Sequence, residues 1–403
     1  MESNVEREES TGLPDFYNTE IAFSNRTDKE LQFIYWLFSV MQKGWTVDLG
    51  SRLGLFAVKY RLPFFASFVK KTMFYHFCGG ENLEDCKGII EHMRHFNVSG
   101  ILDYGAEAKS SPSELDRVVE EVIKAIQFAG MDKNLPVVSI KITGLALDSV
   151  LEKMNNKEVM SAEEEAARER MWSRVNRICE TASQNDVQIY VDAEESWIQV
   201  AIDDMVDQLM EKYNTEKALI FNTYQLYRHD KLEQLKNDHQ KAKLKGYVLG
   251  AKLVRGAYIE KENLRAGDLK IPSPIHQDKE ATDRDYNAAL KYCIHHLDEI
   301  SVCCATHNMD SSRFLAQWME KLNIARNHPN VRFSQLLGMS DFITFNMARA
   351  GYNASKLIPY GPVKEVIPYL IRRAQENTSV TGEMSRELDF VLKEMKRRGL
   401  KKK

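Results

Sequence analysis

The sequence predicts an α/β protein built as a (βα)8 barrel of eight parallel strands. Eight short apolar runs recur between residues 97 and 360, and helix-forming segments separate most of them. Continuous runs of Val, Ile and Leu indicate strands buried on both faces, as in a parallel sheet covered by helices. Polar side chains gather where the runs end, and in a parallel barrel these ends meet at one mouth. The runs are NVSGILD, PVVSIKI, VQIYVDAE, KALIFNTY, YVLGAKLV, ISVCCATHN, NVRFSQLL and SKLIPY.

The helical segments follow the strands in the alternating order that produces right-handed crossovers. Ser113 is the expected N-cap of the first helix, because a serine hydroxyl accepts a hydrogen bond from the first turn. An open doubly wound sheet is the alternative architecture, but no GxGxxG motif follows the first strand. The predicted helices cover residues 113–130, 163–183, 197–213, 229–246, 281–297 and 311–323.

A barrel of this type takes about 250 residues, so the chain has segments to spare on both sides of it. The acidic first dozen residues differ from a secretory signal or a transit peptide, which predicts a cytoplasmic location. The early apolar stretches are interrupted by charges and by Pro63, so they lack the ~20 apolar residues of a membrane span. The predicted regions are a disordered acidic tail over residues 1–25, a helical segment over 26–95, the barrel over 96–380 and a basic helical tail over 381–403.

Bulk composition excludes two classes of function. Lys plus Arg is 55 and Asp plus Glu is 58, and a net charge of −3 offers no overall attraction to nucleic acid. The six cysteines form no CxxC pair, which indicates a reducing compartment and argues against a thiolate zinc site. His295 and His296 are adjacent on a predicted helix and point apart, so no metal site is expected.

Three segments carry residues suited to chemistry. In residues 251–262, Gly256 and Ala257 end a strand and are small enough for a flat ligand to approach, and Tyr258 adds an aromatic face. His307 follows the strand in CCATHN, where a general base, a metal ligand, a flavin contact and a hydrogen-bonded structural histidine all remain open. The adjacent pair Arg372 and Arg373 matches a carboxylate or a phosphate.

The motifs LVRGAY, ATHN, LLGM, PYLIRRAQEN, VDAEES and FNTYQ occur together in the chain. With these motifs, and over roughly residues 75–380, the sequence resembles the proline dehydrogenase family, FAD enzymes that oxidise proline to 1-pyrroline-5-carboxylate. The resemblance implies a distorted barrel whose last helix lies across the mouth. That placement would let Arg372 and Arg373 clamp a substrate carboxylate from one helix.

The resemblance also implies which residues surround the substrate. Glu107 would pair with Arg372 as a lid, while Tyr258 and Leu336 would pack on the apolar ring. Leu357 stands where relatives commonly carry Tyr, which keeps trans-4-hydroxy-L-proline open as an alternative substrate. The implied substrate-site residues are Glu107, Lys141, Asp192, Tyr258, Leu336, Leu357, Arg372 and Arg373.

For FAD, the resemblance implies hydride transfer to flavin N5 and a quinone as the next electron acceptor. Relatives often carry Arg where Lys252 stands, and Lys keeps the charge without the planar fork. The implied FAD residues are Asp192, Asn222, Lys252, Val254, Gly256, Ala257, Lys279, Thr306, His307, Asn308 and Glu376.

Several alternatives remain beside this interpretation. Lys141 or Lys252 at a strand end would suit a Schiff-base aldolase, and a catalytically silent barrel would suit a scaffold. Glu376 and the two arginines would also suit an ordinary solvated helix face. The basic residues of VLKEMKRRGLKKK would suit either a peripheral membrane contact or a solvated helix end.

Overall fold

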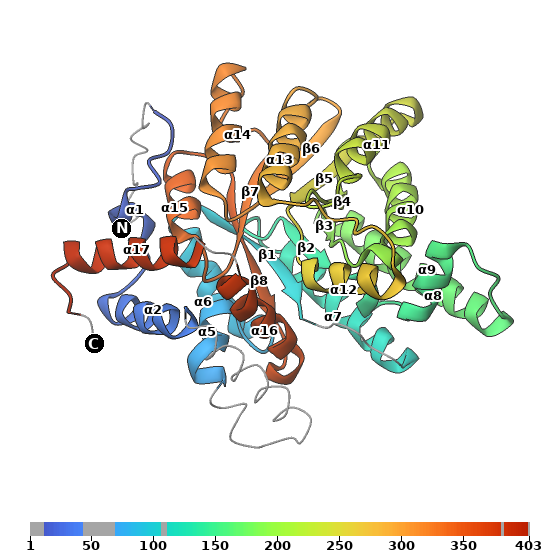
Figure 1. Cartoon of the computed structure of the whole chain (residues 1–403), viewed down its shortest axis with the longest axis horizontal. Helices are drawn as coiled ribbons and strands as arrows, with labels where there is room; N and C mark the ends of the chain where they lie inside the picture. The colour runs from blue at the N-terminus through green and yellow to red at the C-terminus, as the bar shows by residue number, and fades with distance from the viewer. Residues whose placement is uncertain (1–11, 43–68, 106–110, 380–382, 402–403) are drawn as a thin grey trace.

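Eight strands, each hydrogen-bonded in parallel to its neighbour, close into a barrel in the computed structural model of this chain (Figure 1). The structure describes residues 12–42, 69–105, 111–379 and 383–401. β1 pairs with β8 along its whole length, which closes the ring and confirms the predicted fold class. The strands are β1 Val98–Tyr104, β2 Val137–Ile140, β3 Gln188–Val191, β4 Ile220–Gln225, β5 Leu249–Val254, β6 Ile300–Ala305, β7 Val331–Leu336 and β8 Ala354–Tyr360.

Side chains alternate along each strand between the barrel interior and the surrounding helices. An apolar layer fills the interior, contributed by Ile101, Val137, Tyr190, Phe221, Cys303 and Leu357. Above this layer, toward the carboxyl ends of the strands, the inward positions become charged. The apolar layer therefore closes the bottom of a polar mouth.

The helices that surround the strands begin where local capping chemistry predicts. α7 starts after Ser111, whose hydroxyl and backbone form a capping box with Glu114, and Pro112 takes the first helical position. The prediction that Ser113 caps this helix is therefore wrong by two residues. The helices that follow are α7 Pro112–Gly130, α8 Asp148–Asn156, α9 Ala162–Asn185, α10 Ser196–Tyr213, α11 Lys231–Lys245, α12 Ile259–Leu269, α13 Lys279–Ile294, α14 Met309–Lys321 and α15 Asp341–Arg349, with a 3-10 turn at Ile142–Gly144.

Two helices exchange the roles that a regular barrel would give them. α6 (Leu83–Arg94) packs outside β1, where Cys86 lies close to Gly79 and Ile358, so it fills the outer position next to β8. α16 (Val363–Ser379) contacts α2, α17 and the π-helical turn Lys70–Phe74 instead of the outer wall. With the outer position taken, the last barrel helix is free to lie at the mouth.

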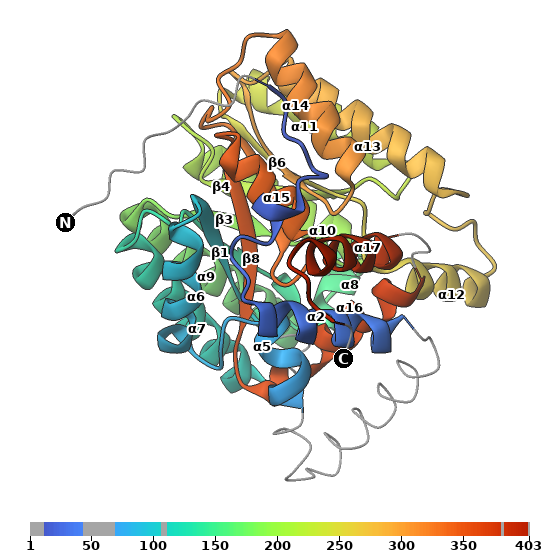
Figure 2. The ribbon, with the colours of Figure 1, turned by 90° about the vertical axis from the view of Figure 1, so that its left-hand side faces the viewer.

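The first and last described helices pack together beside the barrel (Figures 1 and 2). α17 (Glu383–Arg397) lies against α1 (Thr19–Ala22) and α2 (Asp28–Met41). The short helix α5 (Tyr75–Phe77) comes later in the chain, just before α6. Phe16 is fully buried, so the expectation of a disordered tail is wrong for residues 12–25. Residues 1–11 lie outside the described chain. The basic tail is likewise docked, since Arg398 binds Glu394, Asp28 and the carbonyl oxygen of Phe23.

Candidate active site at the barrel mouth

An ionic network lies at the ends of β1, β2, β3 and β5. Asp192 is its centre: Oδ2 lies 3.2 Å from Lys141 Nζ and Oδ1 lies 2.5 Å from Lys252 Nζ. Ser139 donates a further hydrogen bond of 2.9 Å to Asp192. Asp103 lies 3.8 Å from Lys141 on the other side. Four strands far apart in the chain thus deliver one cluster of opposite charges.

Asp192 is held in its charged form. Burial disfavours a carboxylate, yet Lys252 and Lys141, together with hydrogen bonds from Lys252 and Ser139, lower the pKa of Asp192 below its ordinary value. Lys252 also lies 5.7 Å from the centre of the Tyr190 ring, which continues the apolar layer below. The network thus places positive and negative charges in fixed positions at the bottom of the mouth, where they can contact a polar ligand.

Glu194 is a titratable group beside this floor to which the sequence assigned no role. Burial raises the pKa of Glu194 to about 7, although the backbone N–H and the hydroxyl of Thr143 both donate to its carboxylate. The carboxyl therefore exchanges its proton near neutral pH. Its position in VDAEES, two residues after Asp192, was the available signal.

Arg255 is a second residue that the sequence reasoning missed, although it stands within LVRGAY. Its guanidinium donates to Thr306 Oγ1 at 2.6 Å and to Ser311 Oγ at 3.0 Å, and it pairs with Asp283 at 2.7 Å. The charge lies 4.4 Å from the centre of the Tyr286 ring. Arg255 therefore joins the end of β5 to the loop after β6, where Thr306 and His307 follow the strand.

Gly256 has a structural reason to be glycine. Its φ is +138°, and a Cβ there would lie 2.4 Å from the Tyr227 ring. The close neighbour on the Cβ side is thus Tyr227 of the chain itself. Val254 is partly exposed on the inward face, Ala257 is exposed and Tyr258 is half-buried at the start of α12.

His307 lies at the opposite side of the mouth. Burial lowers its pKa to about 3, and the positive charges of Lys356, Arg373 and Arg255 act in the same direction, so the imidazole is neutral. Nδ1 lies 2.9 Å from Ser340 Oγ. Of the roles left open for His307, a neutral ring bonded to Ser340 fits the hydrogen-bonded structural histidine and the flavin contact.

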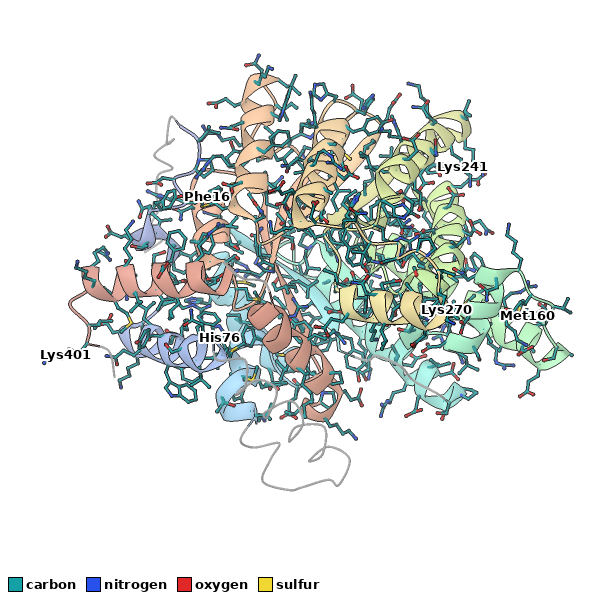
Figure 3. All side chains as sticks on the ribbon, viewed as in Figure 1. Phe16, His76, Met160, Lys241, Lys270 and Lys401 are labelled. Carbon is teal, nitrogen blue, oxygen red and sulfur yellow. The ribbon has the colours of Figure 1, made fainter. Side chains whose placement is uncertain are left out.

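The loop after β7 holds Ser340 in place. Gly338 has a φ of +78°, and a Cβ there would lie 2.4 Å from the carbonyl oxygen of His76. His76 Nε2 lies 2.8 Å from the Gly338 carbonyl oxygen, and Figure 3 shows His76 beside α2. Lys356 pairs with Asp341 at 2.8 Å, and Arg26 pairs with the same carboxylate at 3.0 Å. Segments outside the barrel thus support this loop.

α16 brings the two predicted arginines to the mouth. Its first turn packs on β1, where Val366 lies beside Gly105, and farther along Arg373 is close enough to His307 to act on its pKa. The helix therefore passes from the β8 and β1 side toward β6. Arg373 is 8% exposed and Arg372 is half-buried, so neither extends freely into bulk water.

Leu336 and Leu357 lie on neighbouring strands at the edge of the apolar layer. Leu357 is buried with Ile101, and Leu336 packs against the same cluster. The surface that they offer to the mouth is aliphatic.

Asn222 does not face the mouth. Its Nδ2 donates to Asp203 of α10 at 3.0 Å, on the outer face of β4, so the expectation that it lines FAD is wrong. Gln225 and Thr223 occupy the inward positions of this strand, and Gln225 Nε2 donates to the Glu194 carbonyl oxygen at 2.8 Å. Gln225, within FNTYQ, is therefore a residue of β4 that faces the mouth and that the sequence interpretation did not name.

Two further predicted FAD residues have structural contacts of their own. Asn308 is the N-cap of α14, where Oδ1 accepts from the N–H groups of Asp310 and Ser311. Lys279 is exposed and pairs with Asp283 at 2.5 Å, which links it to Arg255. Glu107 and the side chain of Glu376 lie outside the described part of the structure.

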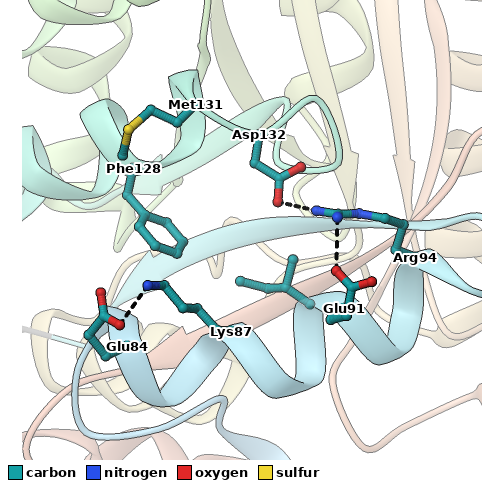
Figure 4. A pocket seen from close by; sticks show the side chains of 8 residues that line it. Glu84, Lys87, Glu91, Arg94, Phe128, Met131 and Asp132 are labelled. Atoms are coloured by element: carbon teal, nitrogen blue, oxygen red, sulfur yellow. Dashed lines mark hydrogen bonds and ion pairs between the residues drawn. The ribbon is translucent and has the colours of Figure 1, made fainter.

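A groove on the outer wall is separate from the mouth (Figure 4). It lies between α6 and α7, with a volume of about 500 Å³. Its charged side chains pair among themselves, as Lys87 with Glu84 and Arg94 with Glu91 and Asp132.

No helix in the described ranges combines the length and apolar character of a membrane span. Within the same residues, no group of three His, Cys, Asp or Glu side chains is arranged to hold a metal.

The family described as "Proline dehydrogenase" matches residues 86–386 of this chain. "Proline dehydrogenase 1, mitochondrial" of Dictyostelium discoideum is 30% identical over 98% of this chain and 78% of its own length. "Carbapenem antibiotics biosynthesis protein CarD" of Pectobacterium carotovorum subsp. carotovorum is 30% identical over 94% of this chain and 98% of its own length. "Proline dehydrogenase 1, mitochondrial" of Homo sapiens is 41% identical over 59% of this chain and 40% of its own length.

Among solved structures, the fold is similar to proline utilization A from Bdellovibrio bacteriovorus inactivated by N-propargylglycine. The TM-score is 0.71 at 21% identity, covering 91% of this chain and 38% of that chain. A proline utilization A mutant from Bradyrhizobium japonicum gives a TM-score of 0.65 at 16% identity, covering 94% of this chain and 42% of that one. The chain thus spans about two fifths of these larger proteins.

Proposed function

This chain belongs to the proline dehydrogenase family, and from that premise we propose that it oxidises L-proline to 1-pyrroline-5-carboxylate with FAD as the hydride acceptor. The observation that carries the proposal is the position of Arg373, a cationic side chain on α16 that is 8% exposed and acts on the neutral His307, with the half-buried Arg372 next to it in the chain. A forked guanidinium donor matches a carboxylate in both geometry and charge.

The donor set at the mouth fits a flavin dinucleotide. Lys252 and Gln225 offer hydrogen-bond donors at the inner floor, and Arg255 with Lys279 offers positive charge for phosphates at the rim. His307 adds a neutral ring on the opposite side. When bound, FAD supplies a hydride acceptor at N5.

The protein residues act mainly by position. Arg372 and Arg373 bind the substrate carboxylate, and Leu336 with Leu357 contacts the apolar ring. Holding the reacting carbon about 3 to 3.5 Å from its acceptor contributes several kcal/mol through proximity alone. Lys141 and Asp192 hold a fixed charge pattern against the substrate amine, and α16 excludes water from above.

L-Proline is preferred over trans-4-hydroxy-L-proline in this proposal. Leu357 is 7% exposed within an aliphatic cluster with Ile101 and Leu336. A buried hydroxyl without a hydrogen-bond partner costs about 1 to 3 kcal/mol, which disfavours the hydroxylated ring. The ion pairs of Lys141 and Lys252 with Asp192 argue against a Schiff-base aldolase, because a protonated amine has no lone pair for attack.

The decisive experiment is an anaerobic titration of the purified protein with L-proline and with trans-4-hydroxy-L-proline, followed by flavin absorbance. Bleaching at lower concentrations of L-proline supports the proposal. A protein that binds FAD but is bleached by neither compound refutes the activity. Trapping of a ketone on Lys141 or Lys252 by borohydride would favour the aldolase instead.

A quinone is the proposed electron acceptor, with a peripheral membrane contact as its route. Arg397 and Arg398 are paired with Glu394, so the exposed Lys393 and Lys396 of α17 and Lys401 after it are the remaining sources of positive charge. Replacing Lys401, Lys402 and Lys403 by Gln should weaken binding to vesicles containing phosphatidylserine and leave dye-linked activity intact. Unchanged vesicle binding would remove the tail from the proposal. Several relatives are mitochondrial by name, so the cytoplasmic location stays a prediction.

A further inference from the structure

A hydrogen-bonded chain runs from the C-terminal helix α17 to the barrel mouth. Glu387 of α17 accepts from the backbone N–H of Ser340 and, at 3.1 Å, from its hydroxyl. Ser340 Oγ lies 2.9 Å from His307 Nδ1. Glu387 is 6% exposed and Ser340 is 2% exposed, so water does not compete for these bonds. Glu387 also lies one residue beyond the segment that matches the family.

The protons in this chain can be assigned because serine has only one to donate. Glu387 Oε1 accepts both hydrogen bonds from Ser340, and an oxygen in that role accepts whether or not the carboxyl carries a proton on its other oxygen. The Ser340 hydroxyl proton is therefore used toward Glu387. Its oxygen then accepts a hydrogen bond from His307, which requires the proton of the neutral ring to be on Nδ1.

The backbone of Ser340 strengthens this assignment. Its φ is 52°, in the left-handed region that residues other than Gly rarely adopt. Such a conformation persists where surrounding contacts hold it, and Glu387 binds both the N–H and the hydroxyl of this residue. The next residue, Asp341, is held in the same way by ion pairs with Lys356 and Arg26.

We propose that Glu387 is a positioning residue that, through Ser340, fixes His307 as the Nδ1–H tautomer and leaves Nε2 as a hydrogen-bond acceptor for a donor group of the bound flavin. The ligand in this inference rests on the proposed function, whereas the tautomer is a property of the chain itself. The C-terminal helix is then part of the cofactor site although it lies outside the barrel.

The test separates hydrogen bonding from folding by three variants. Glu387→Met removes the acceptor at similar size, Glu387→Gln keeps a carbonyl oxygen for both bonds, and Ser340→Ala removes the hydroxyl. Nitrogen-15 NMR of the full chain with labelled histidine rings reads the tautomer, with the His307 signals identified by their loss in His307→Asn. We expect Nδ1–H in the wild type and in Glu387→Gln, and a mixture of tautomers in Glu387→Met and Ser340→Ala.

The functional readout is the dissociation constant of FAD, measured by flavin fluorescence. Glu387→Met should raise it about tenfold, the factor that loss of one hydrogen bond gives, while Glu387→Gln stays near the wild type. In the His307→Asn background, Glu387→Met should add nothing, because the two residues act through one path.

Three results would overturn the inference. They are an Nε2–H ring in the wild type, an unchanged ring in both Glu387→Met and Ser340→Ala, and additive effects of Glu387→Met and His307→Asn on FAD binding. Circular dichroism of each variant shows whether it folds, and Ser340→Ala replaces Glu387→Met if the latter does not. A wild-type protein that binds no FAD would refute the proposed function, while the NMR result would still decide the tautomer.

Discussion

The two sides of the barrel mouth are supported in different ways. On the side of β1 to β5, Asp192, Lys141 and Lys252 hold one another, and each stands at or near a strand end. On the side of β6 to β8, His307 depends on a loop that Glu387 and Arg26 stabilise from the two ends of the chain. The first side belongs to the barrel, and the second is completed by segments added to it.

This difference predicts how each side fails. Loss of a charge on the first side leaves its buried partner without a counter-charge, which lowers the stability of the folded protein directly. Loss of a contact on the second side releases a strained loop and alters ligand binding, with a smaller effect on the barrel.

The largest expected effect follows Asp192→Ala. The change removes the carboxylate shared by Lys141 and Lys252, and breaking a buried pair costs about 3 to 5 kcal/mol. Urea unfolding measures the free energy of unfolding, and FAD binding should be lost as well. Glu120→Ala is the matched control, because Glu120 lies within α7 and its pair with Arg177 is 54% exposed on the glutamate side. A loss no greater than the control, which should stay below about 1 kcal/mol, would contradict the network.

The second effect is a pH dependence on the other side of the mouth. Burial and the charge of Asp341 raise the pKa of Glu387 to about 7 from an ordinary 4.5, although Ser340 and Lys356 oppose the change. Between these two pH values Glu387 keeps its proton in the folded protein and loses it in the unfolded chain. Its contribution to the free energy of unfolding is therefore complete below about pH 4.5 and is lost as pH rises through about 7.

Glu387→Gln should remove this fall in the free energy of unfolding with pH. The fall amounts to roughly 3 kcal/mol in total, at about 1.36 kcal/mol for each unit by which the pKa is raised. Unfolding free energies of wild type and variant, compared from pH 4.5 to 7.5, measure the difference. Glu194→Gln is the matched change on the first side, because burial raises the pKa of Glu194 to about 7 as well. Parallel pH curves for wild type and Glu387→Gln would be inconsistent with a buried carboxyl at this position.

The third effect concerns the helix that bridges both sides. Arg373→Met removes a guanidinium that is 8% exposed, and loss of a charge-assisted hydrogen bond corresponds to roughly a 10- to 100-fold rise in KM for L-proline. Steady-state kinetics with a dye acceptor measure it. Arg117→Met is the control, because Arg117 pairs with Glu365 at the start of the same helix and is 52% exposed. Equal KM values for the two variants would refute the clamp.

The smallest effect follows Arg26→Met. Lys356 still pairs with Asp341 after the change, so the free energy of unfolding should fall by only about 1 to 2 kcal/mol. The dissociation constant of FAD should rise a few-fold, since the loop that holds Ser340 loses one support. Arg168→Met, in an exposed pair with Glu165 on α9, should change neither quantity. If Arg26→Met lowered the free energy of unfolding but left the dissociation constant of FAD unchanged, the loop that holds Ser340 would have no role in FAD binding.

The errors of the sequence interpretation have two physical origins. Alternation along β4 decides whether Asn222 or Gln225 faces inward, and a one-residue difference in register reverses the faces. β4 reads IFNTYQ, with polar residues on both faces, so its sequence shows no alternating pattern from which to read that register. The contacts of Glu387 with Ser340 join residues 47 positions apart, and no local pattern specifies such a pair.

The sequence by itself determined the barrel, because buried parallel strands must be apolar throughout and must alternate with helices. It also determined the charged floor, since Asp192, Lys141 and Lys252 stand at or near the ends of strands. Only the tertiary structure decided that α6 takes the outer position of α16, and that Glu387 and Arg26 complete the His307 side. Those contacts join distant segments, and they form only when the whole chain has folded around the barrel.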